Sequence, residues 1–176
     1  MAENGLIHIY CGDGKGKTTA AVGLSIRAAG AGLKVVLVQF LKSLPTSELK
    51  ILEGLPNYTI LRGKEGNAFS FSMTDEEREK TKRTHDENLK KALDLVNKEC
   101  CDILILDEII GACQRELVDK KLLKDFVLNK PENLELVMTG RNPEEWMLNA
   151  ADYISEIRKV QHPYDKGIPA RIGIEK

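Results

Sequence analysis

Residues 6–19 read LIHIYCGDGKGKTT, a short apolar run followed by a glycine-rich loop. The run Leu6–Tyr10 predicts a strand, and residues 18–29 predict a helix. In a glycine-rich loop between a strand and a helix, backbone N–H groups can converge on phosphate oxygens, and the helix adds its positive N-terminal end. The stretch therefore predicts a nucleotide-phosphate site. Its candidate binding residues are Gly12, Asp13, Gly14, Lys15, Gly16, Lys17, Thr18 and Thr19.

The loop is one residue shorter than the general phosphate-loop pattern. The pattern G-x-x-x-x-G-K-[ST] requires a glycine at position 11, which is Cys11 here, so the spacing is G-x-x-x-G-K-T. A glycine-rich turn without a ligand is the alternative, but its place between strand and helix favours phosphate binding. We expect Lys17 to contact phosphate and Thr18 to offer its hydroxyl to Mg²⁺. Asp13 would repel phosphate but could reach a ribose hydroxyl.

Short apolar runs alternate with helical segments along the rest of the chain. Runs that are apolar on both faces are typical of a parallel sheet covered by helices, and they lie at residues 34–40, 58–61, 102–107 and 134–138. Helix starts are expected at a capping box on Thr74, near Asp119 and at Asn142. We expect one α/β domain, residues 1–176, with a mostly parallel sheet. Residues 170–174 could add an edge strand.

Composition excludes several classes of protein. The 176 residues are 42% hydrophobic and 30% charged, with a net charge of −1, so nothing indicates a nucleic-acid or membrane partner. No apolar run approaches the roughly 18 residues of a membrane span, and no signal peptide is recognisable. The spacing of the four cysteines suits neither a zinc site nor an easy disulfide, which favours reduced thiols in a cytoplasmic protein.

Two carboxylates end the apolar run at residues 103–106. Asp107 and Glu108 are expected at the carboxyl end of a parallel strand, beside the phosphate loop. A solvated strand end is the alternative. Because a cation that bridges phosphates needs oxygen ligands, we expect Thr18, Asp107 and Glu108 to hold Mg²⁺, without deciding which carboxylate binds directly.

A residue that would activate water or an acceptor hydroxyl is harder to find. Glu108, His85 and His162 are candidates, but none lies in a recognisable catalytic pattern, and His85 is expected to be solvated in a charged helix. From the residues alone, a small-molecule kinase, a nucleotide hydrolase and a non-catalytic ATP-dependent switch stay open.

Two more segments are candidate ligand contacts. Phe69 and Phe71 lie close together in a chain that is only 5% aromatic; a hydrophobic staple or a loop packed on the core would also explain them. Arg141 follows a predicted strand where α/β proteins hold ligands, and it could contact phosphate or pair with an acid.

In their order along the chain, these segments resemble the BtuR/CobA/CobO type of corrinoid adenosyltransferase, which uses the shortened phosphate loop. The resemblance covers residues 6–175 and rests on residues 12–21, 38–42, 106–108, 139–141 and 151–160, followed by His162, Asp165, Gly167 and Gly173. It implies a three-layer P-loop NTPase fold like the RecA core, and a homodimer. It also implies that the 5′-deoxyadenosyl group of ATP passes to the cobalt(I) of a corrinoid, which a reductase supplies with electrons, and that triphosphate is released.

The resemblance also implies roles for single residues. Lys17, Thr18 and Mg²⁺ would stabilise the leaving triphosphate, and no base would be needed because cobalt(I) is itself the nucleophile. Phe69 and Phe71 match two aromatic residues that crowd the lower face of the corrinoid and ease reduction of its cobalt, although the second is often Trp in the family. Arg27 matches an arginine near the nucleotide.

Overall fold

A computed structural model describes residues 4–42, 46–63, 73–98 and 100–175. In this part of the chain, six parallel strands form one sheet in the order β3-β2-β4-β5-β1-β6. The strands are β1 (Ile7–Cys11), β2 (Val35–Gln39), β3 (Tyr58–Arg62), β4 (Ile103–Asp107), β5 (Glu135–Thr139) and β6 (Tyr153–Glu156). The expected α/β fold with a parallel sheet is confirmed.

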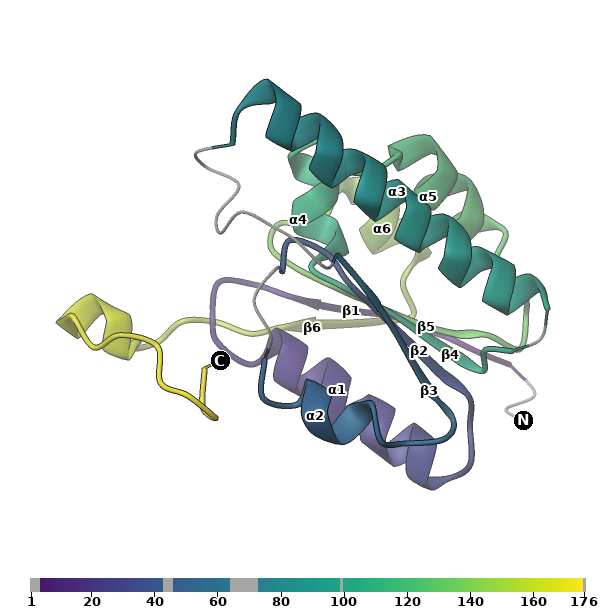
Figure 1. Cartoon of the computed structure of the whole chain (residues 1–176), viewed down its shortest axis with the longest axis horizontal. Coiled ribbons are helices and arrows are strands. Elements are labelled where there is room, and N and C mark those ends of the chain that lie inside the picture. Colours follow the sequence, from purple (N-terminus) through teal and green to yellow (C-terminus); the bar gives the residue numbers. More distant parts are fainter. Residues whose placement is uncertain (1–3, 43–45, 64–72, 99, 176) are drawn as a thin grey trace.

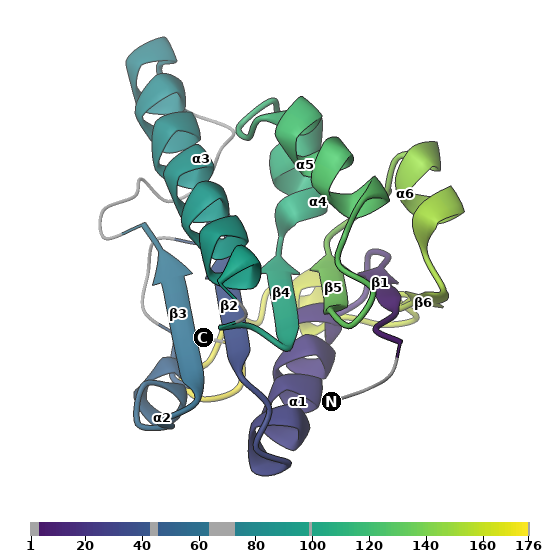
Figure 2. The same ribbon diagram turned by 90° about the vertical axis from the view of Figure 1, so that its right-hand side faces the viewer.

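Helices cover both faces of the sheet, which gives three layers (Figures 1 and 2). One face carries α1 (Lys17–Gly30) and the short α2 (Leu49–Leu52). The other carries α3 (Asp75–Asn97), α4 (Ile109–Gln114), α5 (Lys120–Leu128) and α6 (Glu145–Ala150). After β6 the chain runs out beyond the carboxyl ends of the strands and includes a 3₁₀ turn, Pro163–Lys166.

The apolar core has two halves, one on each face of the sheet. Val35 and Leu37 of β2 pack in the cluster that contains Ala21 of α1, whereas Val36 and Val38 pack in the cluster that contains Leu89 of α3. Successive side chains of a strand point to opposite faces, so β2 and β4 are apolar on both faces up to their last residue, and both are buried along their whole length. The same alternation places Gln39 and Asp107 on the α1 face, at the carboxyl end of the sheet.

The capping box of the longest helix is confirmed. The Thr74 hydroxyl accepts a hydrogen bond from the backbone N–H of Glu77, and the Glu77 carboxylate accepts one from the backbone N–H of Thr74. The helix ends at Asn97, as expected.

Two expectations about secondary structure are wrong. Residues 170–174 form no strand; the edge strand beside β1 is β6, whose four residues are all exposed and therefore carry no alternating apolar signal. Asn142 does not cap α6, because its φ of 50° lies in the left-handed region, and the helix begins at Glu145 after an N-cap on Glu144.

The four cysteines, Cys11, Cys100, Cys101 and Cys113, are all free, and all but Cys100 are buried. In the described residues, no helix is both long enough and apolar enough to cross a membrane.

Candidate active site

A pocket of about 700 Å³ lies at the carboxyl end of the sheet, where α1 begins. Its volume is within the range of small-molecule sites. Several parts of the chain form its wall: the loop at residues 13–19, Lys42, residues 46–48 and 51 around α2, Glu108 after β4, Arg141 after β5, and the segment 162–175 that follows β6. The carboxyl ends of parallel strands are where open α/β sheets bind ligands.

The glycines of the loop allow the chain after β6 to pass close by. A Cβ atom on Gly12, whose φ is 103°, would lie 2.4 Å from the carbonyl oxygen of Ile157. A Cβ atom on Gly14 would lie 2.8 Å from the same oxygen and from the backbone of Arg158. The N–H of Gly14 also donates to the Ile157 oxygen, at 2.8 Å. This N–H is therefore engaged within the protein and does not point to a phosphate here.

Lys17, the first residue of α1, folds its side chain back onto the phosphate loop. Its ammonium donates a 2.7 Å hydrogen bond to the carbonyl oxygen of Gly14, and only 7% of the residue is exposed. Burial lowers the pKa of this ammonium, and the carboxylate of Glu108 opposes the shift. A buried cation with a single backbone partner, at the N-terminal end of a helix, is suited to bind an anion.

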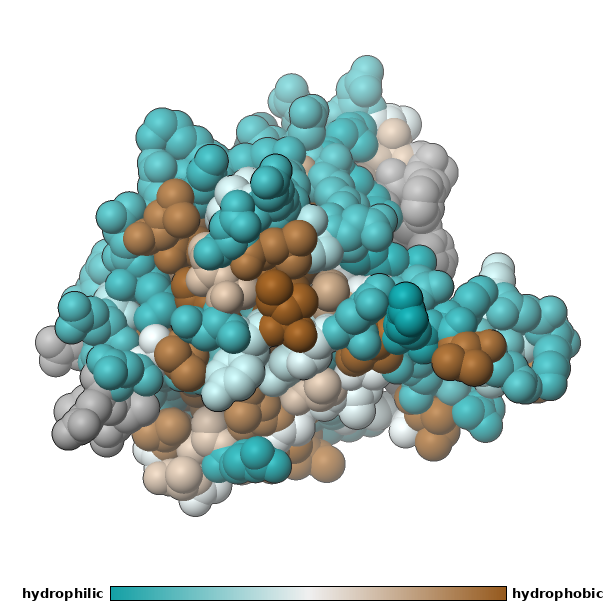
Figure 3. All heavy atoms as spheres, turned by 180° about the vertical axis from the view of Figure 1, so that it is seen from behind, coloured by the Kyte–Doolittle hydropathy of each residue, from teal (hydrophilic) through white to brown (hydrophobic). Residues whose placement is uncertain are grey.

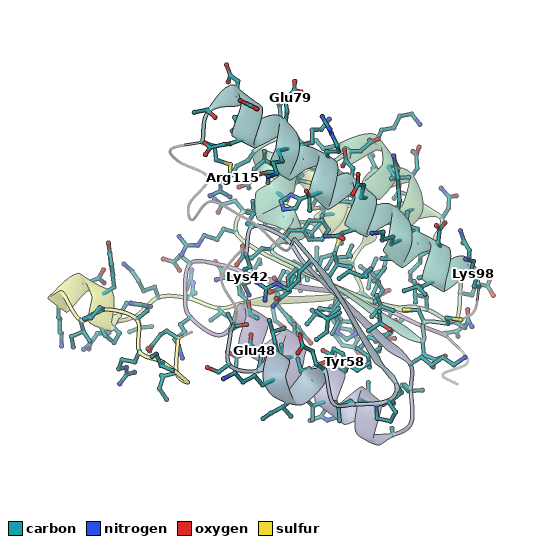
Figure 4. All side chains as sticks on the ribbon, viewed as in Figure 1. Lys42, Glu48, Tyr58, Glu79, Lys98 and Arg115 are labelled. Carbon is teal, nitrogen blue, oxygen red and sulfur yellow. The ribbon has the colours of Figure 1, made fainter. Side chains whose placement is uncertain are left out.

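Three side chains meet on Asp107, which is fully buried. The hydroxyls of Thr18 and Thr139 donate to its Oδ1 at 2.9 and 2.8 Å, and the Lys42 ammonium donates to its Oδ2 at 2.5 Å. The same ammonium lies 3.0 Å from the Thr18 hydroxyl oxygen. Figure 4 labels Lys42 at the carboxyl end of the sheet, near the start of α1. The network joins three strand ends to the phosphate loop.

Glu108 follows Asp107 in a strained backbone conformation with a φ of 62°. Its N–H donates to the Thr139 hydroxyl at 2.9 Å, and its carboxyl group borders the pocket. Burial, and then the charge of Asp107, raises the pKa of this carboxyl group. Thr18 and Asp107 lie together and carry oxygen atoms of the kind that magnesium binds, and the Lys42 ammonium occupies a place between them. The magnesium-binding role of Thr18, Asp107 and Glu108 stays a prediction.

Gln39 ends β2 beside Asp107 on the same face of the sheet. It is 1% exposed, and within the described residues neither atom of its amide has a hydrogen-bond partner. Buried amides are rarely left without a hydrogen-bond partner. The amide of Gln39 can therefore still take a partner beside Asp107.

Asp13 joins the loop to the segment that follows β6. Its carboxylate accepts a hydrogen bond from the backbone N–H of Lys159 at 2.9 Å, and this bond is the main cause that lowers its pKa. The expected ribose contact of Asp13 stays a prediction.

His85 is buried, which corrects the expectation that it is solvated. It lies on the inner face of α3, where its Nε2 accepts from the N–H of Leu41 at 3.3 Å and its Nδ1 lies 2.8 Å from the carbonyl oxygen of Leu117. Both ring nitrogens are engaged, so His85 cannot serve as a base in the pocket. His162 does line the pocket, and its Nδ1 accepts from the N–H of Tyr164 at 3.1 Å.

The structure brings most of the predicted residues together, but not all. Loop residues 13–19, Glu108 and Arg141 line the pocket. Asp107 lies behind the pocket wall and accepts hydrogen bonds from two lining residues, Thr18 and Lys42. Arg27 is exposed in the last turn of α1, about 15 Å along the helix from Lys17 at 1.5 Å per residue, so its role stays a prediction that this single chain does not support. Phe69 and Phe71 lie outside the described residues.

Sequence reasoning assigned no role to Lys42, Thr139 or Gln39. The sequence did carry a signal for two of them. Gln39 and Thr139 are each the polar last residue of a mostly apolar strand, just as Asp107 is the last residue of β4. The wall formed by residues 162–175 had no local signal.

Comparison with known proteins agrees with this geometry. Residues 3–175 match the family model described as ATP:corrinoid adenosyltransferase BtuR/CobO/CobP. The chain is 32% identical to a corrinoid adenosyltransferase of Escherichia coli K12, covering 98% of this chain and 86% of that protein. It is 31% identical to one of a Sinorhizobium species, covering 98% and 81%. Among solved structures, the cytoplasmic domain of EssC aligns with 100% of this chain and 38% of its own, at 20% identity and a TM-score of 0.55, which concerns the fold alone.

Proposed function

The chain belongs to the ATP:corrinoid adenosyltransferase family BtuR/CobO/CobP, and on this premise we propose how its pocket carries out the reaction. The enzyme transfers the 5′-deoxyadenosyl group of ATP to the cobalt of a reduced corrinoid, in cobalamin biosynthesis or salvage. The observation that carries the proposal is the shortened phosphate loop at the rim of a pocket that is lined by the buried Lys17.

The reaction needs no base from the protein. Cobalt(I) of the corrinoid substrate donates an electron pair to C5′ of ATP, the C5′–O5′ bond breaks, and its electron pair leaves on the triphosphate, so the cobalt becomes cobalt(III). The protein has to align the two reactants and offset the charge on the leaving group. Lys17 and Arg141 border the pocket and supply positive charge, and residues 13–19 hold the triphosphate chain.

A magnesium ion is proposed on the oxygen atoms of Thr18, Asp107 and Glu108. When bound, it would neutralise part of the phosphate charge. The hydroxyl of Thr139 holds Asp107 in place, and its oxygen accepts the N–H of Glu108, so one threonine orients both carboxylate residues.

Other parts of the proposal rest on the family. We propose that residues 1–176 act as a single domain, that two copies form a homodimer in the cytoplasm, and that a reductase supplies the electrons for cobalt(I). Phe69 and Phe71 are proposed to contact the lower face of the corrinoid, and Arg27 to bind the nucleotide. Of these residues, Arg27 would have to act from a second copy, because it lies away from the pocket of its own chain.

A nucleotide hydrolase is the alternative that the assay has to exclude. Glu108 borders the pocket directly after Asp107, where a carboxylate could activate water. The two reactions break different bonds of ATP. Adenosyl transfer releases intact triphosphate, whereas hydrolysis at the terminal phosphate releases diphosphate and inorganic phosphate.

Phosphorus NMR of the products decides between them. The protein is incubated without oxygen with ATP, Mg²⁺ and chemically reduced cobalamin. We expect one triphosphate for each light-sensitive alkylcobalamin formed; diphosphate as the main product, or turnover without corrinoid, would contradict the proposal.

Lys17→Ala provides the variant for this assay. We expect it to bind ATP about 10- to 100-fold more weakly, the usual effect of losing a hydrogen bond between charged groups. Lys50→Ala removes an exposed lysine of α2 and is the matched control, with unchanged activity.

A further inference from the structure

The ammonium of Lys42 lies in the position that a metal ion would need. Its nitrogen lies 3.0 Å from the Thr18 hydroxyl oxygen and 2.5 Å from Asp107 Oδ2. The Thr18 hydroxyl also donates to the other carboxylate oxygen, Asp107 Oδ1, at 2.9 Å. These two residues are among the three expected to bind the cation that accompanies a nucleotide. One pair of oxygen atoms thus faces two candidate cations, a side chain of the protein and a metal ion.

We propose that Lys42 is an internal cation that holds this site in the ligand-free enzyme and is exchanged for the divalent ion when the nucleotide binds. The proposal rests on the proposed magnesium site. Magnesium binds its oxygen ligands at about 2.0–2.1 Å, so the metal and the ammonium cannot share the space between Thr18 and Asp107.

The need for an internal cation follows from the burial of Asp107. Its side chain has 0% exposure, and a buried carboxylate without a positive partner is strongly unfavourable. The Lys42 side chain is 22% exposed, so its ammonium can leave towards the solvent side of the pocket, which it already lines. In the exchange, Asp107 stays in place and the Lys42 ammonium moves away.

The backbone holds the start of the Lys42 side chain close to the site. The N–H of Phe40 donates to the carbonyl oxygen of Asp107 at 2.9 Å, which joins the end of β2 to the end of β4. Leu41 follows with a φ of 55°, a strained value for a residue with a side chain, and its N–H is bound by His85. These contacts fix the two residues before Lys42, while its own flexible stem permits the exchange.

The exchange has a consequence for metal binding. Without nucleotide, a divalent ion must displace Lys42 and offset the charge on Asp107 with no phosphate to complete its ligands. Lys17 and Arg141 also border the pocket and repel a lone cation. Metal and nucleotide should therefore bind together, with little binding of the metal alone.

Titration with Mn²⁺ alone, followed by electron paramagnetic resonance, tests this directly. We expect Lys42→Met to bind Mn²⁺ about tenfold or more tightly than the unchanged protein, because it removes a competing positive charge from the ligand oxygens. Lys42→Arg keeps the charge and should show no gain. Lys50→Met, on the exposed face of α2, is the matched control for loss of one positive charge.

Thermal unfolding shows whether Lys42→Met still folds. The variant should melt at a lower temperature than the unchanged protein, and Mn²⁺ should raise its melting temperature more than that of the unchanged protein. Equal or weaker Mn²⁺ affinity in Lys42→Met, with normal binding of Mn²⁺ plus ATP, overturns the exchange but leaves the proposed function standing. Failure of every form to bind Mn²⁺, even with ATP, overturns both the exchange and the proposed magnesium site.

Discussion

At the scale of single residues, His85 connects the core to the pocket without touching the ligand space. Its Nε2 accepts the N–H of Leu41, so the proton of the neutral ring must be on Nδ1, which donates to the carbonyl oxygen of Leu117. The ring also packs edge-on against Phe40. A charged imidazole would carry a proton on Nε2 and would lose the bond that holds the turn before Lys42.

His85 therefore predicts a loss of stability in mild acid. Burial lowers its pKa below the usual 6.5, so the unfolded chain takes up the proton first as the pH falls. The contribution to stability is complete above about pH 6.5 and decreases below it, until the pH reaches the lowered pKa of the folded state. The slope is at most about 1.4 kcal/mol per pH unit.

Urea unfolding at pH 7.5, 6.5 and 5.5 measures this effect. His85→Gln is the comparison, since it keeps a donor and an acceptor but does not titrate in this range. The free energy of unfolding should fall more steeply in the unchanged protein than in His85→Gln. Equal slopes would show that His85 does not carry the pH dependence.

At the scale of elements, α3 depends on its cap more than on its own apolar content. It is a highly charged helix of 23 residues that begins with Asp75, Glu76 and Glu77, which suit the positive end of a helix, and its first backbone N–H groups are met by the capping box. The helix contributes Leu89 and Ala92 to the core and places His85 against Phe40, which follows β2. Fraying of its first turns would loosen one layer of the fold.

Thr74→Ala tests the cap. We expect the free energy of unfolding to fall by about 1 kcal/mol, the usual value for loss of an N-cap side chain. Thr84→Ala makes the same change within the helix, where the threonine hydroxyl only returns a hydrogen bond to the carbonyl oxygen of Lys80. This control should show no loss; equal losses at both positions would mean that the cap is not the cause.

At the scale of the whole molecule, the segment after β6 forms a wall of the pocket while contributing little to the core. Almost all of residues 160–175 are exposed, including Val160, Tyr164, Ile172 and Ile174. Figure 3 shows apolar side chains on this projecting segment. Its contacts with the body of the protein come earlier, where Ile157 and Lys159 bind the phosphate loop.

Removal of residues 160–176 tests whether this segment contributes to ATP binding, to stability, or to both. We expect ATP to bind about tenfold more weakly, because one wall of the pocket is lost, while the melting temperature stays close to that of the full chain. Isothermal titration with ATP and a thermal melt measure the two effects. Unchanged ATP affinity would exclude the segment from the nucleotide site, and a large drop in melting temperature would show that it supports the fold.

The local sequence was enough to place β1, the phosphate loop, the buried strands and the cap of α3, because each depends on the pattern of neighbouring residues. It also pointed to Lys17 and Thr18 through the glycine-rich loop, and to Asp107 and Glu108 because carboxylates stood out at the end of an apolar run; the fold brings these four residues together. The family resemblance added the reaction, which no single motif in the residues specified.

Only the tertiary structure could show the rest. His85 is buried because it lies on the inner face of a charged helix, where it meets Leu41, 44 positions away. The bond of Lys42 to Asp107 joins residues 65 positions apart, and the bond of Lys159 to Asp13 joins residues 146 positions apart. The exposed strand β6 has no apolar alternation, so its pairing with β1 depends on backbone hydrogen bonds. Backbone pairing and long-range contacts leave no periodic trace in a sequence, and this is why the pocket had to be assembled from the fold.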